Sequence, residues 1–369
     1  MWILDDVTPL RELARGMLDP TLHLFRPSPV YRLTRQVYGL ESLIALYHGC
    51  AGANPPSGVV ISYRLGRPAE RVTVSLLDAA GTVVNSFDSR TEPRPPAPIG
   101  PMAYQLRYGS ASLTGAVAGE EEPGIRWGAQ TLDRGANPHR LPVAEGLHRV
   151  TLDITYPGAR RVPGAMTRGI TAPIAPPGAY RVWLTVDGET REHPVEIRPD
   201  PRLATTPEEY RAQFELMLGI RDTVSAIHDA VNGLRDLRGQ IEARLRPLAG
   251  RPEWEPVRAA AAALLAELAE IERHLIQPNL HERSGELDSI HFPIRLNNKL
   301  EALGYHVARS DNPPTAQDRA LFADLGHQAD EQLARWRRVL GEDVAEFNRV
   351  VLEAAVPAVV APADPHRDT

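Results

Sequence analysis

The sequence is poor in cysteine and lysine and has no long apolar run. Its 369 residues include one cysteine, Cys50, which excludes both an internal disulfide and a zinc site built from several cysteines. Lys299 is the only lysine. No stretch approaches the ~20 apolar residues that cross a bilayer, and we find no basic segment followed by an apolar one, as in a signal peptide. These absences predict no membrane span and leave the localisation open.

Acidic side chains outnumber basic ones, 47 to 41, which gives a formal net charge of −6. This balance argues against a nucleic-acid partner held by phosphate contacts. The motifs of P-loop, dinucleotide-binding, zinc-protease and serine-hydrolase sites are also missing. We therefore expect no cofactor, and the residues name no reaction. With 43% hydrophobic and 24% charged residues, the chain nevertheless has the composition of a folded globular protein.

Residues 54–203 carry a β pattern. Asp187-Gly188 is typical of a two-residue hairpin, and Gly81 suits the left-handed position of a second turn. We predict an antiparallel β-sandwich of immunoglobulin or fibronectin-III type, with Trp183 facing its core and a long Pro/Gly-rich insertion at 89–145. The runs that alternate and are rich in β-branched residues are 59–65, 72–77, 82–87, 147–154, 180–186 and 190–198.

Residues 204–357 carry a helical pattern. Thr206 and Glu209 can form a capping box around Pro207, and apolar residues then recur every three or four positions for about forty residues. Further helices are predicted over 254–277, 293–308 and from Thr315 to near residue 357. We expect an elongated antiparallel helical bundle, followed by a disordered tail at 358–369. The predicted fold is thus multidomain, all-β followed by all-α.

Residues 1–53 do not form a domain in this prediction. The first seven residues form an apolar strand, Thr8-Pro9 begins a short helix, and 23–25 and 30–33 are candidate short strands before a linker. An isolated strand leaves unpaired N–H and C=O groups on both edges, so it must pair with a sheet. The predicted partner-docking residues are therefore Trp2, Ile3, Leu4, Asp5 and Asp6.

Several motifs, weak alone, are specific in combination. They are Trp-Ile-Leu-Asp-Asp-Val-Thr-Pro-Leu-Arg at 2–11, Asn-Pro-Pro-x-Gly at 54–58, Ala-Pro-Pro-Gly-x-Tyr-x-Val at 175–182, Asp-Pro-Arg at 200–202 and the helical segments 292–300 and 343–348. Together they resemble the C-terminal portion of bacterial sialidase-like, BNR-repeat proteins with a sortilin-like β-propeller. The resemblance implies a last propeller strand, an immunoglobulin-like domain and a helical bundle.

The sequence also departs from that family. It contains none of the Asp-box repeats of the propeller, so the resemblance implies that the propeller lies outside this chain, in a longer or a split protein. Proteins of the family are often labelled glycosyl hydrolases and are commonly exported. The catalytic chemistry and the export signal are both expected on the missing propeller, and the resemblance does not transfer either of them to this chain.

We therefore predict a non-catalytic accessory or scaffold region that docks on a β-propeller domain, in cis or in trans, and presents a surface for a glycan or protein ligand. Two alternatives stay open. One is a part of a sialidase-like glycoside hydrolase that acts together with the propeller. The other is a carbohydrate-binding module.

Two residue groups are candidate sites. The aromatic side chains of Trp127, Tyr104 and Tyr108 fall in the predicted insertion and can form a flat platform for a sugar. A cluster of potential hard-metal ligands or acid/base groups falls between predicted helices and consists of His281, Glu282, Glu286, Asp288 and His291. The pair of His48 and Cys50 admits a thiol-nucleophile interpretation, but a linker cysteine next to an unrelated histidine explains it as well.

Overall fold

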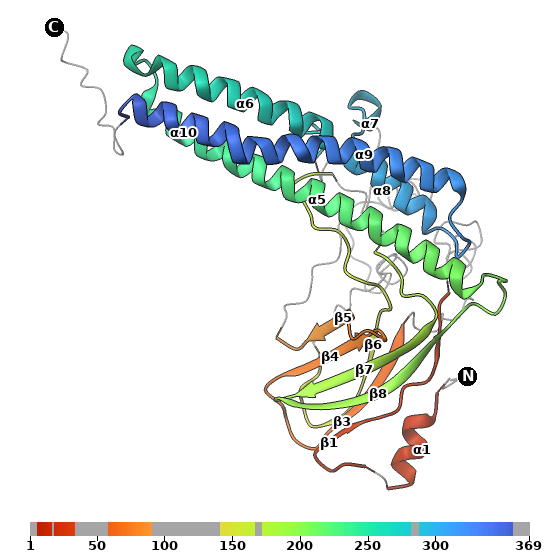
Figure 1. Cartoon of the computed structure of the whole chain (residues 1–369). Helices are drawn as coiled ribbons and strands as arrows, with labels where there is room; N and C mark the ends of the chain where they lie inside the picture. Colours follow the sequence, from red (N-terminus) through yellow and green to blue (C-terminus); the bar gives the residue numbers. More distant parts are fainter. Residues whose placement is uncertain are drawn as a thin grey trace, which may run out of the picture. The chain divides into compact units, whose positions relative to one another are not determined.

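The computed structural model describes residues 6–16, 18–33, 58–90, 141–166, 172–281 and 288–356, and it contains both β-sheet and helix (Figure 1). The chain divides into two compact units. The first takes its described residues from Met1–Gly158, Ala172–Leu218 and Val307–Pro314. The second takes them from Ala159–Thr171, Gly219–His306 and Thr315–Thr369. Both units are therefore assembled from segments that are not contiguous in sequence.

The first unit contains two sheets. The three-stranded sheet has the order β1-β3-β6 and is antiparallel, with β1 at Leu22–Leu24, β3 at Val59–Leu65 and β6 at Gly146–Leu152. The five-stranded sheet has the order β2-β8-β7-β4-β5 and comprises β2 at Val30–Tyr31, β8 at Glu189–Arg198, β7 at Gly178–Val186, β4 at Val72–Leu77 and β5 at Val83–Asp88. The six strands predicted for the β segment are confirmed, with no end shifted by more than two residues.

Alternating side chains of both sheets share one hydrophobic core. In β4, for example, Val72, Val74 and Leu76 are fully buried, whereas Thr73 and Ser75 between them are partly exposed, as the two-residue period of a strand requires. Core residues of the other strands are Leu22, Leu24, Val59, Ile61, Tyr63, Leu65, Val84, Val150, Leu152, Tyr180, Val182, Leu184, Val195 and Ile197. Burial of this shared face is what holds the unit together.

The predicted turns are confirmed. Asp187 and Gly188 have φ angles of 48° and 94°, as a two-residue hairpin between β7 and β8 needs. Gly81 has a φ of 85° before β5, a conformation that glycine adopts without steric cost.

Two strands of the N-terminal segment belong to these sheets. β1 pairs antiparallel with β3, and β2 pairs parallel with the end of β8. The candidate short strands at 23–25 and 30–33 are confirmed as β1 and β2, but their pairing with these sheets was not predicted. A strand of two residues such as β2 carries too little pattern to reveal a partner more than 160 residues away. The apolar strand predicted for the first seven residues lies mostly outside the described residues, and α1 at Thr8–Ala14 follows it.

The second unit is helical. Its helices are the later part of α5 (Pro207–Leu245), α6 (Glu255–Leu275), α7 (Asp288–His291), α8 (Leu296–Val307), α9 (Ala316–Arg338) and α10 (Val344–Glu353), with a π-helical turn at Val339–Asp343 and 3₁₀ turns at Arg246–Leu248 and Pro252–Trp254. Capping boxes at Thr206 with Glu209 and at Thr315 with Asp318 start α5 and α9. The π-helical turn and α7 were not predicted.

Glycines on α5 let aromatic rings of α9 approach its backbone. A Cβ on Gly233 would lie 2.9 Å from Cζ2 of Trp336, and one on Gly219 would lie 2.9 Å from Cζ of Phe322. α6 contacts both α9 and α10. Trp254, which precedes α6, is buried and 8% exposed.

The expected separation into an all-β and an all-α domain is wrong. The unit that holds both sheets also takes in helical residues as far as Leu218. The reason is that Phe214 of α5 packs against the core of the sheets, with its ring centroid 4.9 Å from that of Tyr156. The domain boundaries after residues 53 and 203 stay predictions.

Candidate functional site

The predicted docking segment is described only at its end. Trp2, Ile3, Leu4 and Asp5 lie outside the described residues. The carboxylate of Asp6 accepts hydrogen bonds from the backbone N–H of Thr8 at 2.9 Å and from the hydroxyl of Ser28 at 2.8 Å. Burial raises the pKa of Asp6, but these hydrogen bonds outweigh it, so the pKa lies below its ordinary value. Asp6 thus holds the start of α1, and docking stays a prediction.

The predicted sugar platform, Trp127, Tyr104 and Tyr108, lies outside the described residues, as do His48 and Cys50. Trp183, which we predicted to face the core of the sheets, faces away from it. Trp183 of β7 is 36% exposed, and its indole N–H donates to the carboxylate of Glu192, its partner on β8, at 2.9 Å. Its neighbours Val182 and Leu184 point inward instead, so the prediction chose the wrong face of the strand.

The predicted metal cluster is described in part. Glu282 and Glu286 lie outside the described residues, and Asp288 is the first residue of α7. His281 and His291 are both exposed, and the backbone of His281 forms a bridge with Ala165. In the part of the chain that the structure describes, no three His, Cys, Asp or Glu side chains are grouped to hold a metal ion. The metal site stays a prediction.

The first unit contains a buried polar group that we did not predict, the Arg32 cluster, formed by Arg32, Tyr210, Gln213 and Asp311. Arg32 follows β2. Tyr210 and Gln213 lie on the first turns of α5, and Asp311 lies between α8 and α9. Nε of Arg32 donates to Oδ1 of Asp311 at 3.0 Å, and Nη2 donates to Oε1 of Gln213 at 2.5 Å. Its guanidinium carbon lies 4.9 Å from the centroid of the Tyr210 ring.

Backbone carbonyls complete this cluster. Nη1 of Arg32 lies 3.3 Å from the carbonyl oxygen of Ile174 and 3.4 Å from that of Ala175. The amide nitrogen of Gln213, which has two hydrogens to donate, lies 3.1, 2.6 and 3.2 Å from the carbonyl oxygens of Val307, Ser310 and Asn312. Hydrogen bonds of this cluster therefore connect four separate segments of the chain, at residues 32, 174–175, 210–213 and 307–312.

The charges of this cluster are almost fully removed from water. Arg32 and Asp311 are each 3% exposed. Burial, and then the nearby carboxylate of Asp311, raise the pKa of the Tyr210 phenol. A buried ion pair is costly to desolvate, and it persists only where its geometry and remaining hydrogen bonds are good. The arrangement is suited to holding segments in place.

The second unit contains a row of polar side chains on one face of α5, the α5 stripe, formed by Ser225, His228, Asp229 and Asn232. Their spacing of three, four and seven residues puts them on one side of the helix. All four bind residues 160–161, at distances between 2.5 and 3.2 Å.

His228 is fully buried within this stripe. Its Nδ1–H donates to the carbonyl of Arg160 at 2.6 Å, because a carbonyl can only accept. Its Nε2 lies 3.5 Å from Nδ2 of Asn297 on α8, which is also fully buried. Burial lowers the pKa of His228, and the bond to Arg160 and the charge of Asp229 offset it only in part. The ring is therefore neutral at pH 7.

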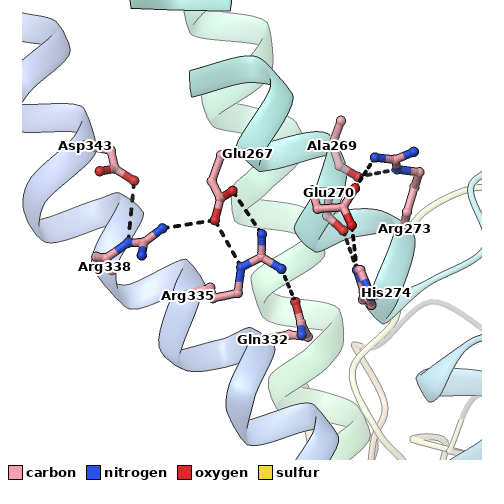
Figure 2. A network of polar contacts seen from close by, with 9 residues as sticks. All are labelled: Glu267, Ala269, Glu270, Arg273, His274, Gln332, Arg335, Arg338 and Asp343. Carbon is pink, nitrogen blue, oxygen red and sulfur yellow. Dashed lines mark hydrogen bonds and ion pairs between the residues drawn. The ribbon is translucent and has the colours of Figure 1, made fainter. Parts of the chain in front are cut away.

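A surface network joins α6 to α9 (Figure 2). The carboxylate of Glu267 accepts two hydrogen bonds from the guanidinium of Arg335, at 3.1 and 2.9 Å, and one from Arg338 at 3.2 Å. Nε of Arg338 also lies 4.0 Å from Oδ2 of Asp343 in the π-helical turn. A second set on α6 links Glu270 with Arg273. Exposed pairs of this kind contribute little individually and more as a network.

The first unit also contains a pocket between Leu22, Leu65, Val186 and Asp187. Its volume is about 90 Å³. Sites for small organic ligands usually measure about 300–1,000 Å³. This pocket is therefore large enough for a few water molecules.

Comparison with known proteins gives no family. No family model and no curated protein matches this chain. The solved structure of pT26-6p aligns over 90% of this chain and 90% of its own, with 10% sequence identity and a TM-score of 0.15. A TM-score this low carries no argument about fold or function. Among the described helices, none has both the length and the apolar character that crossing a membrane requires.

Proposed function

We propose that this chain is a non-catalytic accessory or scaffold region of a BNR-repeat, sortilin-like β-propeller protein, and that it presents an interaction surface. The observation that carries the proposal is how two buried ion pairs are used in the part of the chain that the structure describes. Arg32 binds Asp311, and Glu272 binds both Arg235 and Arg238, so these groups hold chain segments together. A catalytic acid or base instead needs a proton site that faces a substrate cleft.

The proposal includes the finer architecture. We infer that the two sheets of the first unit correspond to an immunoglobulin or fibronectin-III-like sandwich, and that the helices correspond to an elongated antiparallel bundle. The shared core of the two sheets and the contacts of α6 with α9 and α10 support this interpretation.

Docking is proposed to involve the N-terminal residues Trp2–Asp6, which add a strand to the sheet of a propeller blade. Strand addition satisfies the backbone groups of an isolated strand, and apolar side chains on alternate positions add specificity. Asp6 supports this only indirectly, because its two hydrogen bonds fix the chain where the docking segment ends.

Co-expression of this chain with a propeller polypeptide that carries Asp-box repeats, followed by size-exclusion chromatography, tests the proposal. We expect one peak that contains both chains. Replacing Trp2 and Leu4 by alanine should separate them, whereas Trp183→Ala, a change of an exposed tryptophan on β7, should not. Elution of the unchanged chain alone would contradict docking in trans.

Enzymatic activity is measured in parallel. The isolated chain is expected not to hydrolyse aryl glycosides. Turnover by the isolated chain, lost on substitution of its carboxylates, would contradict a non-catalytic role and favour the glycoside hydrolase.

A further inference from the structure

The α5 stripe holds its segment mainly by the main chain. The backbone N–H of Arg160 donates to the Ser225 hydroxyl oxygen at 3.2 Å, and the backbone carbonyl of the same residue accepts from His228 at 2.6 Å. The next carbonyl, of Arg161, accepts from Nδ2 of Asn232 at 3.1 Å. The Ser225 hydroxyl hydrogen is used on the carbonyl of Arg221, which leaves the lone pairs of Ser225 for this contact. Contacts of this kind do not depend on which side chains the bound segment carries.

One side chain of the segment is nevertheless recognised. Nε and Nη2 of Arg160 donate to both carboxylate oxygens of Asp229, at distances of 2.5 to 2.8 Å. This two-pronged geometry is available to arginine and not to lysine. The side chain of Arg161 is exposed, and Val162 beyond it is 3% exposed. The bound segment thus presents an arginine to Asp229, in a pair whose side chains are 64% and 48% exposed, and two positions later a buried apolar residue.

The far end of the segment is also held by main-chain contacts. The N–H of Met166 donates to the carbonyl of Leu280 at 3.2 Å, and its carbonyl accepts from Nδ2 of Asn298 at 3.3 Å. Ala165, 8% exposed, forms a backbone bridge with His281. Residues 159–166, which we call the strap, turn at Val162–Ala165, where the N–H of Ala165 donates to the carbonyl of Val162 at 3.2 Å and Gly164 has a φ of 72°. The strap is thus bound on both sides of this turn.

We propose that the α5 stripe is a binding site for an arginine-bearing polypeptide segment, and that the strap occupies it in cis. A partner segment with arginine and, two positions later, a small apolar residue displaces the strap and makes the same main-chain bonds. This inference deepens the proposed scaffold function, because it gives the chemistry of one protein partner. Its test involves no propeller, so the two proposals can fail separately.

A full-length variant in which residues 159–166 are replaced by glycine and serine tests the site. Its probe is the labelled peptide Ala-Arg-Arg-Val-Pro-Gly-Ala-Met, and fluorescence anisotropy measures binding. We expect saturable binding to the variant and much weaker binding to the unchanged chain, because a tethered strap competes at an effective concentration near the millimolar range.

Matched peptides define the specificity. Glutamine in place of the first arginine, or Asp229→Asn in the chain, should weaken binding about fivefold, the effect of one well-placed ion pair. Glutamine in place of the second arginine changes the peptide charge equally and should leave the affinity unchanged. The proposal would be overturned if the strap-replacement variant is folded, as shown by cooperative unfolding, but does not bind the peptide. It would also be overturned if glutamine at the first arginine and glutamine at the second arginine change the affinity equally.

A second measurement uses the unchanged strap and does not depend on the folding of that variant. Trypsin cuts after Arg160 or Arg161 only when the strap leaves the stripe. The pair of substitutions Ser225→Ala and Asn232→Ala removes two main-chain contacts and should speed this cut severalfold, whereas Gln328→Ala on α9 should not. An unchanged cutting rate in the double variant would overturn the proposal as well.

Discussion

Arg32 and Asp311 are 279 residues apart in sequence and form a buried ion pair, with Nη2 and Oδ1 2.9 Å apart. One residue follows a two-residue strand, and the other lies in the connection between two helices. Among the contacts described above for the first unit, this pair joins the two residues that are farthest apart in sequence. It also makes the stability of that unit depend on a residue from the last fifth of the chain.

Removing one member of this pair should be costly. Asp311→Asn leaves the guanidinium of Arg32 buried without its counter-charge, and we expect a loss of about 3–5 kcal/mol in the free energy of unfolding, measured by urea titration. The double change to Arg32→Met and Asp311→Leu removes both charges and should restore much of that loss. Arg349→Met, in an exposed pair with Glu346, serves as the control and should cost under about 1 kcal/mol. Equal effects at the two sites would contradict the burial argument.

The close contact of Gly233 with Trp336 predicts that alanine substitution at two glycines of α5 changes the stability of the chain in opposite directions. Gly233→Ala puts a methyl group 2.9 Å from the indole and should destabilise the chain by about 1–3 kcal/mol. Gly239→Ala on the same helix meets nothing within 4 Å and should stabilise it by about 0.5–1 kcal/mol through helix propensity. Thermal unfolding followed by circular dichroism measures both, and a gain in stability at Gly233 would contradict the packing.

The neutral state of His228 predicts a dependence of stability on pH. Burial lowers its pKa in the folded chain, so as pH falls below about 6.5 the unfolded chain binds a proton that the folded chain does not. The free energy of unfolding should therefore fall between pH 7.5 and 5.5. The groups that face His228 are the carboxylate of Asp229, whose charge opposes the shift, the carbonyl of Arg160 and the amide of Asn297.

His228→Gln keeps a donor for the carbonyl of Arg160 but does not titrate. Its free energy of unfolding should change less over this pH range than that of the unchanged chain. His327→Gln, which removes an exposed histidine on α9, is the matched control and should leave the pH dependence as it was. Parallel curves for the unchanged chain and His228→Gln would rule out a buried neutral ring.

Two carboxylates of α6 provide a comparison of buried and exposed ion pairs. The side chain of Glu272 is 5% exposed and binds Arg235 and Arg238. That of Glu267 is 24% exposed and binds Arg335 and Arg338, as Figure 2 shows. Glu272→Gln should cost about 2–4 kcal/mol and Glu267→Gln under about 1 kcal/mol in urea unfolding. A larger effect at Glu267 would contradict this ranking.

The Glu272 carboxylate also predicts an acid dependence. Burial raises its pKa, but hydrogen bonds from the two arginines outweigh this, so the folded value lies below the ordinary one. Its contribution to stability is therefore complete above about pH 4.5 and is lost as pH falls further. Glu272→Gln should remove this part of the acid sensitivity, as measured by unfolding at pH 5 and pH 3.5.

Local sequence patterns predicted most of the secondary structure. Alternation in Val72–Leu77 and the capping boxes at Thr206 and Thr315 depend on neighbouring residues, so they are visible in sequence. The face of Trp183 was predicted wrongly, because an aromatic residue packs on either side of a strand. The Arg32 cluster and the α5 stripe were missed because their partners are distant in sequence, and a single arginine in a Tyr-Arg-Leu run gives no sign of them.

The interleaving of the two units has a practical consequence for anyone who divides the gene. A cut between residues 203 and 204 leaves Val307–Pro314, with the aspartate that pairs with Arg32, on the opposite fragment from the strands that need it. It likewise leaves the strap on the fragment that lacks Ser225 through Asn232. Neither half then encodes its own unit completely, so shuffling one half between related genes exchanges parts of both.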